Sequence, residues 1–179
     1  MLNELVGIIM VIPLYILCFL YLLKRKISIQ KHIIVFLLFV YLGVVIAITL
    51  FPFPIQKELI LEQREFNYLS NNFIPFKGIV DMLTSERLYV IVRNLVGNIL
   101  LTMPLGFLLP LIFKKINKVK WILISGFLFS LSIENIQFIL SLCLGFTYKI
   151  ADVDDLILNT VGALLGYTCF KLLNFIIKP

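Results

Sequence analysis

Long apolar stretches alternate with short polar segments along this chain of 179 residues. Each stretch is long enough, at 1.5 Å of rise per helical residue, to cross about 30 Å of hydrocarbon. The pattern therefore predicts an all-α polytopic membrane protein with five transmembrane helices in one transmembrane domain, residues 1–179. The expected spans are approximately Leu5–Leu23, Ile33–Phe51, Val90–Phe113, Trp121–Leu142 and Leu156–Ile177.

Charged residues are distributed unevenly around these stretches. Two of the gaps between them are basic and contain no Asp or Glu, and loops rich in Lys and Arg usually stay in the cytoplasm. We therefore expect the N terminus outside and the C terminus in the cytoplasm. The two basic gaps contain Lys24, Arg25, Lys26 and Lys31, and Lys114, Lys115, Lys118 and Lys120.

Composition agrees with a membrane protein and excludes several other classes. Hydrophobic residues make up 61% of the chain, the mean hydropathy is +1.05, and the net charge is +6. Because the basic residues flank apolar stretches, we expect membrane lipids and no nucleic acid as partners. Nucleotide-binding loops and HExxH pairs are absent from the sequence, so no cofactor is expected. Cys18, Cys143 and Cys169 lack the paired spacing of a metal site.

The predicted outer loop between the second and third spans, residues 52–89, is unusual. It begins with a Phe-Pro-Phe-Pro sequence, which ends the second helix because proline supplies no amide donor. The rest of this loop mixes aromatic and aliphatic residues with charged ones, which indicates partly ordered segments that lie in the membrane interface. The alternative is a disordered loop, although disordered segments are usually poor in aromatic residues.

Polar side chains inside the last three spans form pairs at helical spacing. The two members of each pair share a helix face, and the three pairs lie at similar depth near the outer ends of their spans. The sequence therefore predicts a polar pocket in the outer leaflet. The pairs are Asn94 with Asn98, Glu134 with Gln137, and Asp155 with Asn159.

Glu134 is the most informative of these residues. An ionised carboxylate that faces lipid costs several kcal/mol, so such groups normally face a partner or water. Arg93 and Lys149 are the basic residues that could pair with it, and neighbouring asparagines could donate hydrogen bonds. The alternative is a purely structural polar contact, and for each Asn alone interhelical hydrogen bonding is favoured.

The aspartates Asp152, Asp154 and Asp155 allow three interpretations. Asp154 or Asp155 could cap the first turn of the fifth helix. The cluster could hold a divalent cation, but it lacks the glycine turn and the distant glutamate of a calcium loop, so no metal is expected. Asp154 or Asp155 could also act with Glu134 as a general acid or base.

Proline and glycine residues predict two features of the helices. Pro104, Gly106 and Pro110 interrupt the third span, and Pro104 is expected to kink it. Gly162 and Gly166 form a stripe of small residues on the fifth span. Such a stripe lets a neighbouring helix backbone come close.

Five segments between residues 72 and 167 carry a family resemblance. They are Asn72-Phe-Ile-Pro-Phe, Asn94-Leu-Val-Gly-Asn, Met103-Pro-Leu-Gly-Phe-Leu-Leu-Pro, Ser132-Ile-Glu with Gln137, and Asp152-Val-Asp-Asp through Asn159, Gly162 and Gly166. Together they resemble the VanZ-like family of small bacterial membrane proteins, which implies a bacterial cytoplasmic membrane protein. The family is named for a member associated with resistance to teicoplanin, a glycopeptide antibiotic with a lipid tail. Lys149 stands where the family usually has arginine before the aspartates.

Two hypotheses about function follow. The first is an envelope protein that binds an amphiphile in the outer leaflet, either a lipoglycopeptide antibiotic or a lipid-linked cell-wall precursor, and lowers teicoplanin susceptibility. The alternative is a membrane-embedded hydrolase or transferase that acts on a lipid head group or acyl chain through Glu134 and Asp154 or Asp155. An ion-coupled transporter is disfavoured because no inverted repeat is evident. The sequence leaves the ligand, catalysis and oligomeric state open. The expected ligand-binding residues are Asn94, Asn98, Glu134, Gln137, Lys149, Asp152, Asp155 and Asn159.

Overall fold

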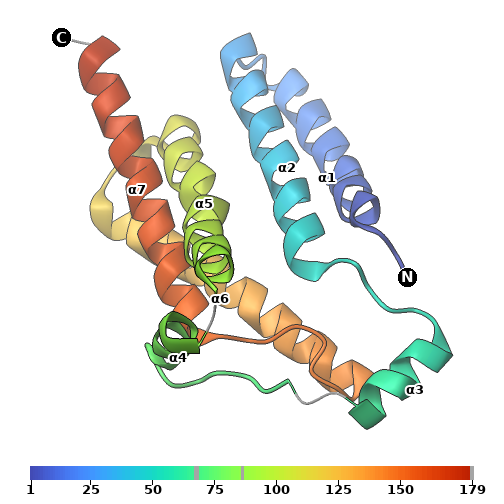
Figure 1. Ribbon diagram of the computed structural model, residues 1–179. Helices are drawn as coiled ribbons and strands as arrows, with labels where there is room; N and C mark the ends of the chain where they lie inside the picture. Colours follow the sequence, from blue (N-terminus) through green and yellow to red (C-terminus); the bar gives the residue numbers. More distant parts are fainter. Residues whose placement is uncertain (67–68, 86, 178–179) are drawn as a thin grey trace. The chain divides into compact units, whose positions relative to one another are not determined.

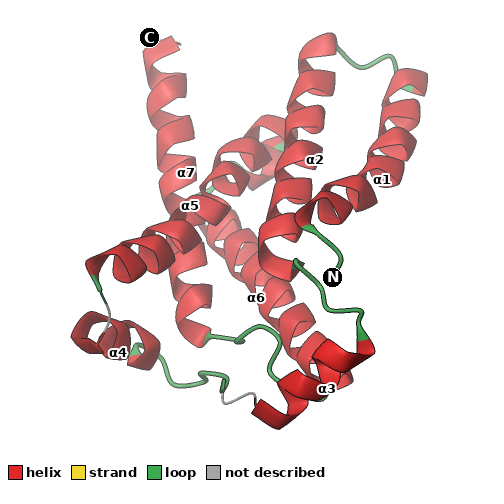
Figure 2. Ribbon diagram, turned by 45° about the vertical axis from the view of Figure 1, so that its right-hand side comes forward, coloured by secondary structure: helices red, strands yellow, loops and turns green. Residues whose placement is uncertain are grey.

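A computed structural model of the chain describes residues 1–66, 69–85 and 87–177. The described part is helical and contains no β-strand (Figures 1 and 2). Contacts divide the chain into two compact units, Met1–Phe66 and Asn67–Pro179, and each is described by itself.

The first unit consists of a long helical hairpin and one short helix. Helices α1 (Glu4–Lys24) and α2 (Ile29–Leu50) pack against each other, and α3 (Lys57–Phe66) follows them. The hairpin helices approach closely at Gly7, where an added Cβ would lie 2.9 Å from the Ala47 Cα. At the open end, Leu2 and Phe53 exchange two backbone hydrogen bonds of 2.9 Å.

The second unit is built around one central helix. It comprises α4 (Lys77–Ser85), α5 (Leu88–Ile112), the short helix η1 (Lys114–Ile116), α6 (Val119–Leu144) and α7 (Val153–Ile177). Helix α7 packs against both α5 and α6 (Figure 1). The core of this unit is a cluster of Ile122, Ala163, Tyr167 and Phe170.

Glycines allow α5 and α7 to pack backbone against backbone. A Cβ added at Gly162 or Gly166 would collide with a main-chain carbonyl of α5, and one added at Gly106 would collide with the Ala163 carbonyl of α7. The predicted close approach at Gly162 and Gly166 is therefore confirmed. Helix α5 continues through Pro104 and Pro110, so Gly106 acts as a packing position rather than an interruption.

The five predicted spans are confirmed, because five helices are long and apolar enough to cross a membrane. Four of them begin two to four residues earlier than the apolar stretches do, since α2 begins at Ile29, α5 at Leu88, α6 at Val119 and α7 at Val153. In α2, α6 and α7 the reason is that polar residues in a first helical turn belong to the helix but not to the apolar stretch. The orientation of the termini and the single domain stay predictions.

The loop between α2 and α5 is not uniformly irregular. Its described residues include two short helices, α3 and α4. Helix α4 contacts both α5 and α7. This contact brings the loop between α2 and α5 to the polar residues of the spans.

Candidate functional site

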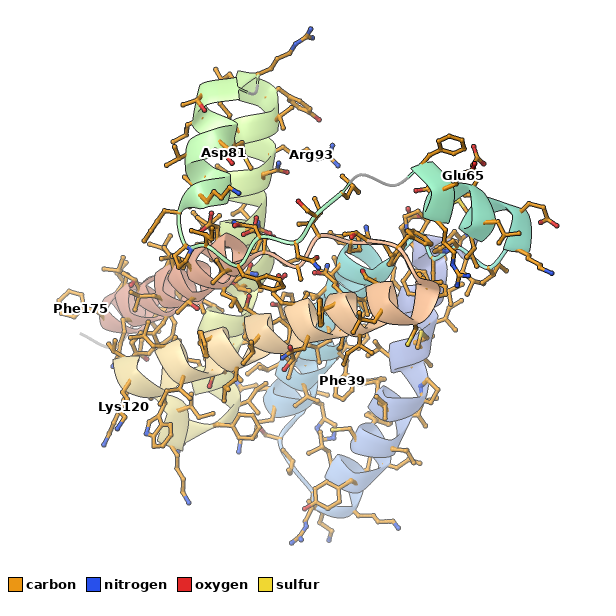
Figure 3. The ribbon with its side chains drawn as sticks, turned by 90° about the horizontal axis from the view of Figure 1, so that it is seen from below. Phe39, Glu65, Asp81, Arg93, Lys120 and Phe175 are labelled. Atoms are coloured by element: carbon orange, nitrogen blue, oxygen red, sulfur yellow. The ribbon has the colours of Figure 1, made fainter. Side chains whose placement is uncertain are left out.

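The polar residues meet where a loop segment before α4 lies beside the loop before α7. We call residues 71–76 the strap. Asn72 in the strap and Asp152 before α7 form a parallel β-bridge, with the Asn72 amide 3.0 Å from the Ala151 carbonyl and the Val153 amide 3.0 Å from the Asn72 carbonyl. Figure 3 shows these two loops running together between α4 and α6. Segments about 80 residues apart are thereby held side by side.

Asp152 caps the start of α7. Its Oδ1 accepts a hydrogen bond of 2.8 Å from the Asp154 amide and one of 2.7 Å from the Asn72 side chain. The interpretation of Asp154 or Asp155 as the cap was wrong. Since α7 begins at Val153, the residue immediately before it, Asp152, occupies the capping position.

Asp154 supports a different helix. Its side chain is only 2% exposed, and its two oxygens accept hydrogen bonds from the Phe76 amide and, at 3.0 Å, from the Ile79 amide. These amides lie at the start of α4, where the first backbone donors of a helix lack helical partners. A Cβ at Gly78 would lie 2.9 Å from Asp152 Oδ2 and 3.1 Å from Asp154 Oδ2, so glycine allows this approach.

Glu134 and Asp155 make the contacts that bring α6 and α5 to the start of α7. Glu134 on α6 is 7% exposed, and its Oε2 accepts a hydrogen bond of 2.8 Å from the Asp152 amide. Asp155 on α7 accepts a hydrogen bond from the Asn98 side chain of α5. We call Asn72, Asn98, Glu134, Asp152, Asp154 and Asp155 the polar cluster.

Asn159 lies one turn along α7 from Asp155 and is 1% exposed. Its Nδ2 donates to Ser130 Oγ of α6 at 2.8 Å, and its backbone carbonyl accepts a hydrogen bond from Thr102 of α5. Its Oδ1 is buried without a hydrogen-bond partner. Asn159 thus links all three spans next to the polar cluster.

The structure does not bring every expected site residue to this place. Asn94 is exposed and donates to the sulfur of Met82 on α4 at 3.8 Å. Gln137 is buried on α6, where its backbone carbonyl accepts the Ser141 hydroxyl at 2.9 Å. The Lys149 ammonium lies over the Tyr148 ring. Arg93, the other basic residue expected near Glu134, is exposed on the part of α5 beside α4 (Figure 3). The hydrogen-bond donor to Glu134 is instead the backbone amide of Asp152.

Sequence reasoning did not include Asn72 or Gly78 in the site. Asn72 donates to Asp152 and, at 3.4 Å, to Asp154, and its Oδ1 accepts the Ile74 amide at 3.2 Å. The available signal was an asparagine two residues before an Ile-Pro-Phe segment, a position typical of an Asx turn. Nothing in the local sequence indicates which distant carboxylates it meets.

The polar cluster is rich in hydrogen-bond acceptors. It contains four carboxyl groups, and within residues 1–66, 69–85 and 87–177 no group of three His, Cys, Asp or Glu side chains is arranged to hold a metal ion. Burial raises the pKa of Asp152 above its ordinary value of 3.8, although hydrogen bonds from the Asp154 amide and the Asn72 side chain partly lower it. The chemistry that this arrangement offers is acceptance of hydrogen bonds from donors, including cationic ones.

We expect Asp152→Asn to flatten the pH dependence of stability. Because the pKa of Asp152 is raised in the folded state, its protonation contributes stability that is complete below 3.8 and lost as the pH rises through the folded-state pKa. The unfolding free energy of the unmodified protein should therefore fall more steeply from about pH 4 upward than that of the variant. Unfolding in detergent at a series of pH values measures this, and parallel curves would contradict it.

The five apolar helices and the polar cluster define a multi-pass membrane protein. A model of the VanZ/LLP1 family matches residues 36–174, and the chain belongs to this family. It is similar to Protein VanZ of Enterococcus faecium, with 30% identity over 141 residues that cover 77% of this chain and 73% of that protein. Together these findings indicate the bacterial cell membrane as its location. No solved structure matches the chain.

Proposed function

We propose that this protein binds an amphiphile at the polar cluster, in the outer leaflet of the bacterial membrane. The observation that supports the proposal is that the polar cluster has more hydrogen-bond acceptors than donors within the protein. Among the described residues, Glu134 and Asp155 each accept one hydrogen bond, which leaves a second carboxylate oxygen on each for a ligand. The carboxyl groups of Asp152 and Asp155 are close enough to Glu134 to interact with it electrostatically.

The chemistry of the cluster defines the head group that fits it. Carboxylates repel phosphate and accept hydrogen bonds from hydroxyl, amide and ammonium groups, and such charge-assisted bonds are stronger than neutral ones. A ligand rich in sugar hydroxyls and amines fits this better than a diphosphate. A lipoglycopeptide antibiotic is therefore favoured over a lipid-linked cell-wall precursor, unless the sugars of the precursor alone reach the cluster.

The apolar helices that carry the cluster would allow the lipid tail of the ligand to lie in the membrane. Glu134, Asp155 and Asn98 all lie on helices long and apolar enough to span the membrane. A ligand whose head group reached them could leave its acyl chain in the adjoining hydrocarbon. Sequestering such a molecule in the membrane would lower teicoplanin susceptibility without a chemical reaction.

A membrane-embedded hydrolase or transferase is the second candidate. It is favoured by the proximity of Glu134 and Asp155, since two carboxyl groups in different surroundings can divide the roles of acid and base. Asp154 uses both of its oxygens on the start of α4, so this alternative assigns the second role to Asp155. Mass spectrometry of lipids and teicoplanin after incubation with the purified protein would reveal a product.

Glu134→Gln and Asp155→Asn should each weaken teicoplanin binding to the protein in nanodiscs by about 10-fold or more. A hydrogen bond to a charged group contributes about 1.5–3 kcal/mol, and 1.4 kcal/mol corresponds to a factor of ten. Both substitutions keep the size of the side chain and replace one carboxyl oxygen with an amide nitrogen, which removes an acceptor. Titration monitored by calorimetry gives the dissociation constants.

The matched control for this experiment is Glu65→Gln. Glu65 is an exposed glutamate of α3 in the other unit and lies outside the polar cluster. The Glu65→Gln protein should bind teicoplanin as tightly as the unmodified protein. Unchanged affinity in folded Glu134→Gln and Asp155→Asn proteins would refute the proposed site.

A further inference from the structure

Helix α4 presents three different faces. Ile79 and Met82, one turn apart, are half-buried. The face made by Lys77, Asp81 and Thr84 is exposed and polar. The third face is exposed but apolar.

This third face continues into the strap. We call Phe73, Ile74, Phe76, Val80 and Leu83 the apolar surface of the outer loop, and each of these side chains is more than half exposed. Within α4, at 100° per residue, Val80 and Leu83 fall about 60° apart, on one side of the helix. An exposed apolar stripe beside an exposed polar one is typical of a helix that lies in a membrane interface.

The position of α4 identifies what covers this surface. Helix α4 contacts α5 and α7, both of which are membrane spans, and Figures 1 and 2 both show it next to the beginning of α5. The first turns of α5 expose Leu88, Tyr89 and Val92. The apolar surface is therefore continuous with a surface that faces lipid.

We propose that the strap and α4 form an interfacial anchor whose apolar surface is inserted into the lipid where α5 and α7 enter the bilayer. The polar face of α4 then points to water. This inference is independent of the proposed function, because it concerns lipid contact and not the carboxylates.

The anchor also sets the level of the polar cluster. Asp154 holds the amides of Phe76 and Ile79, and Asn72 holds Asp152, so the carboxyl groups are fixed to the backbone of the inserted segment. A helix in the interface places its polar atoms at the level of the lipid head groups. The cluster is thereby held at the depth where amphiphile head groups lie.

Depth-dependent fluorescence quenching tests the anchor. The chain contains a single tryptophan, Trp121, so Trp121→Phe gives a background without indole fluorescence. In this background, Leu83→Trp and Asp81→Trp place the probe on opposite sides of α4, two residues apart. The full chain is reconstituted into phosphatidylcholine vesicles that contain phospholipid brominated on the upper part of its acyl chains.

We expect the brominated lipid to quench Leu83→Trp at least three-fold more strongly than Asp81→Trp, with a blue-shifted emission for Leu83→Trp. Equal quenching of both probes, or weak quenching of both, would overturn the proposal. Weak quenching of both would mean that protein, such as the first unit of the same chain or a second copy, covers this surface instead of lipid. Val80→Trp serves as the apolar-side probe if the Leu83→Trp protein does not fold.

Discussion

Gly106→Ala is expected to destabilise the second unit by about 3 kcal/mol, the upper part of the range for overpacking. A Cβ at this position would overlap the main-chain carbonyl of Ala163 on α7, so the two helices would have to move apart along their whole contact. A flexible side chain could turn away from an added methyl group, whereas a helix backbone cannot. Reversible unfolding in mixed micelles, followed by circular dichroism, measures the loss.

Gly97→Ala is the matched control, because it is the same change on the same helix. A Cβ at Gly97 would meet nothing within 4 Å. Alanine also favours the helix over glycine by up to about 1 kcal/mol, so this variant should be at least as stable as the unmodified protein. If the two variants unfold alike, the close contact between α5 and α7 does not contribute to the stability of the second unit.

The spans could be predicted from the sequence because crossing hydrocarbon imposes a minimum apolar length. Their first turns could not, since residues such as Asp154 and Asp155 are polar but helical. The role of Gly106 was missed for a different reason. Its neighbours Pro104 and Pro110 indicated an interruption, while its actual role depends on the position of Ala163 on another helix.

Helical periodicity predicted that some of the polar side chains lie close together in the polar cluster. Asn98 and Asp155 came together because both point inward on helices that pack along most of their length. Asn94 shares a face with Asn98 but lies one turn nearer the start of α5, where the neighbour is Met82 of α4 instead of α7. The ligand-binding roles of all these residues remain predictions.

The strap could not be assigned from the sequence, because its partners lie far away in the chain. The bridge between Asn72 and Asp152 joins two loops, and loop geometry depends on tertiary contacts that a local pattern does not contain. The aspartate cluster was ambiguous for the same reason. Its members differ in function only through what they meet: Asp152 meets the start of its own helix, Asp154 the start of α4, and Asp155 a side chain of α5.

Asp154→Ala should release the strap and α4 while leaving the packing of α5, α6 and α7 intact. The substitution removes the acceptor for the Phe76 and Ile79 amides. A buried donor left without a partner costs about 1–3 kcal/mol, so the two together favour local opening. In hydrogen exchange followed by mass spectrometry, amides within residues 72–85 should exchange at least ten-fold faster than in the unmodified protein.

A second variant separates the loss of the acceptor from the loss of charge. Asp154→Asn keeps one carbonyl oxygen, so it can hold one of the two amides, and exchange in residues 72–85 should be intermediate. Peptides from the middle of α5 and α7 should be unchanged in both variants, because the glycine contacts there do not involve Asp154. If exchange in residues 72–85 were the same in Asp154→Ala as in the unmodified protein, the carboxylate would not be what holds α4. Acceleration throughout the second unit would instead show that Asp154 supports the whole unit, and the strap would then be no separate element.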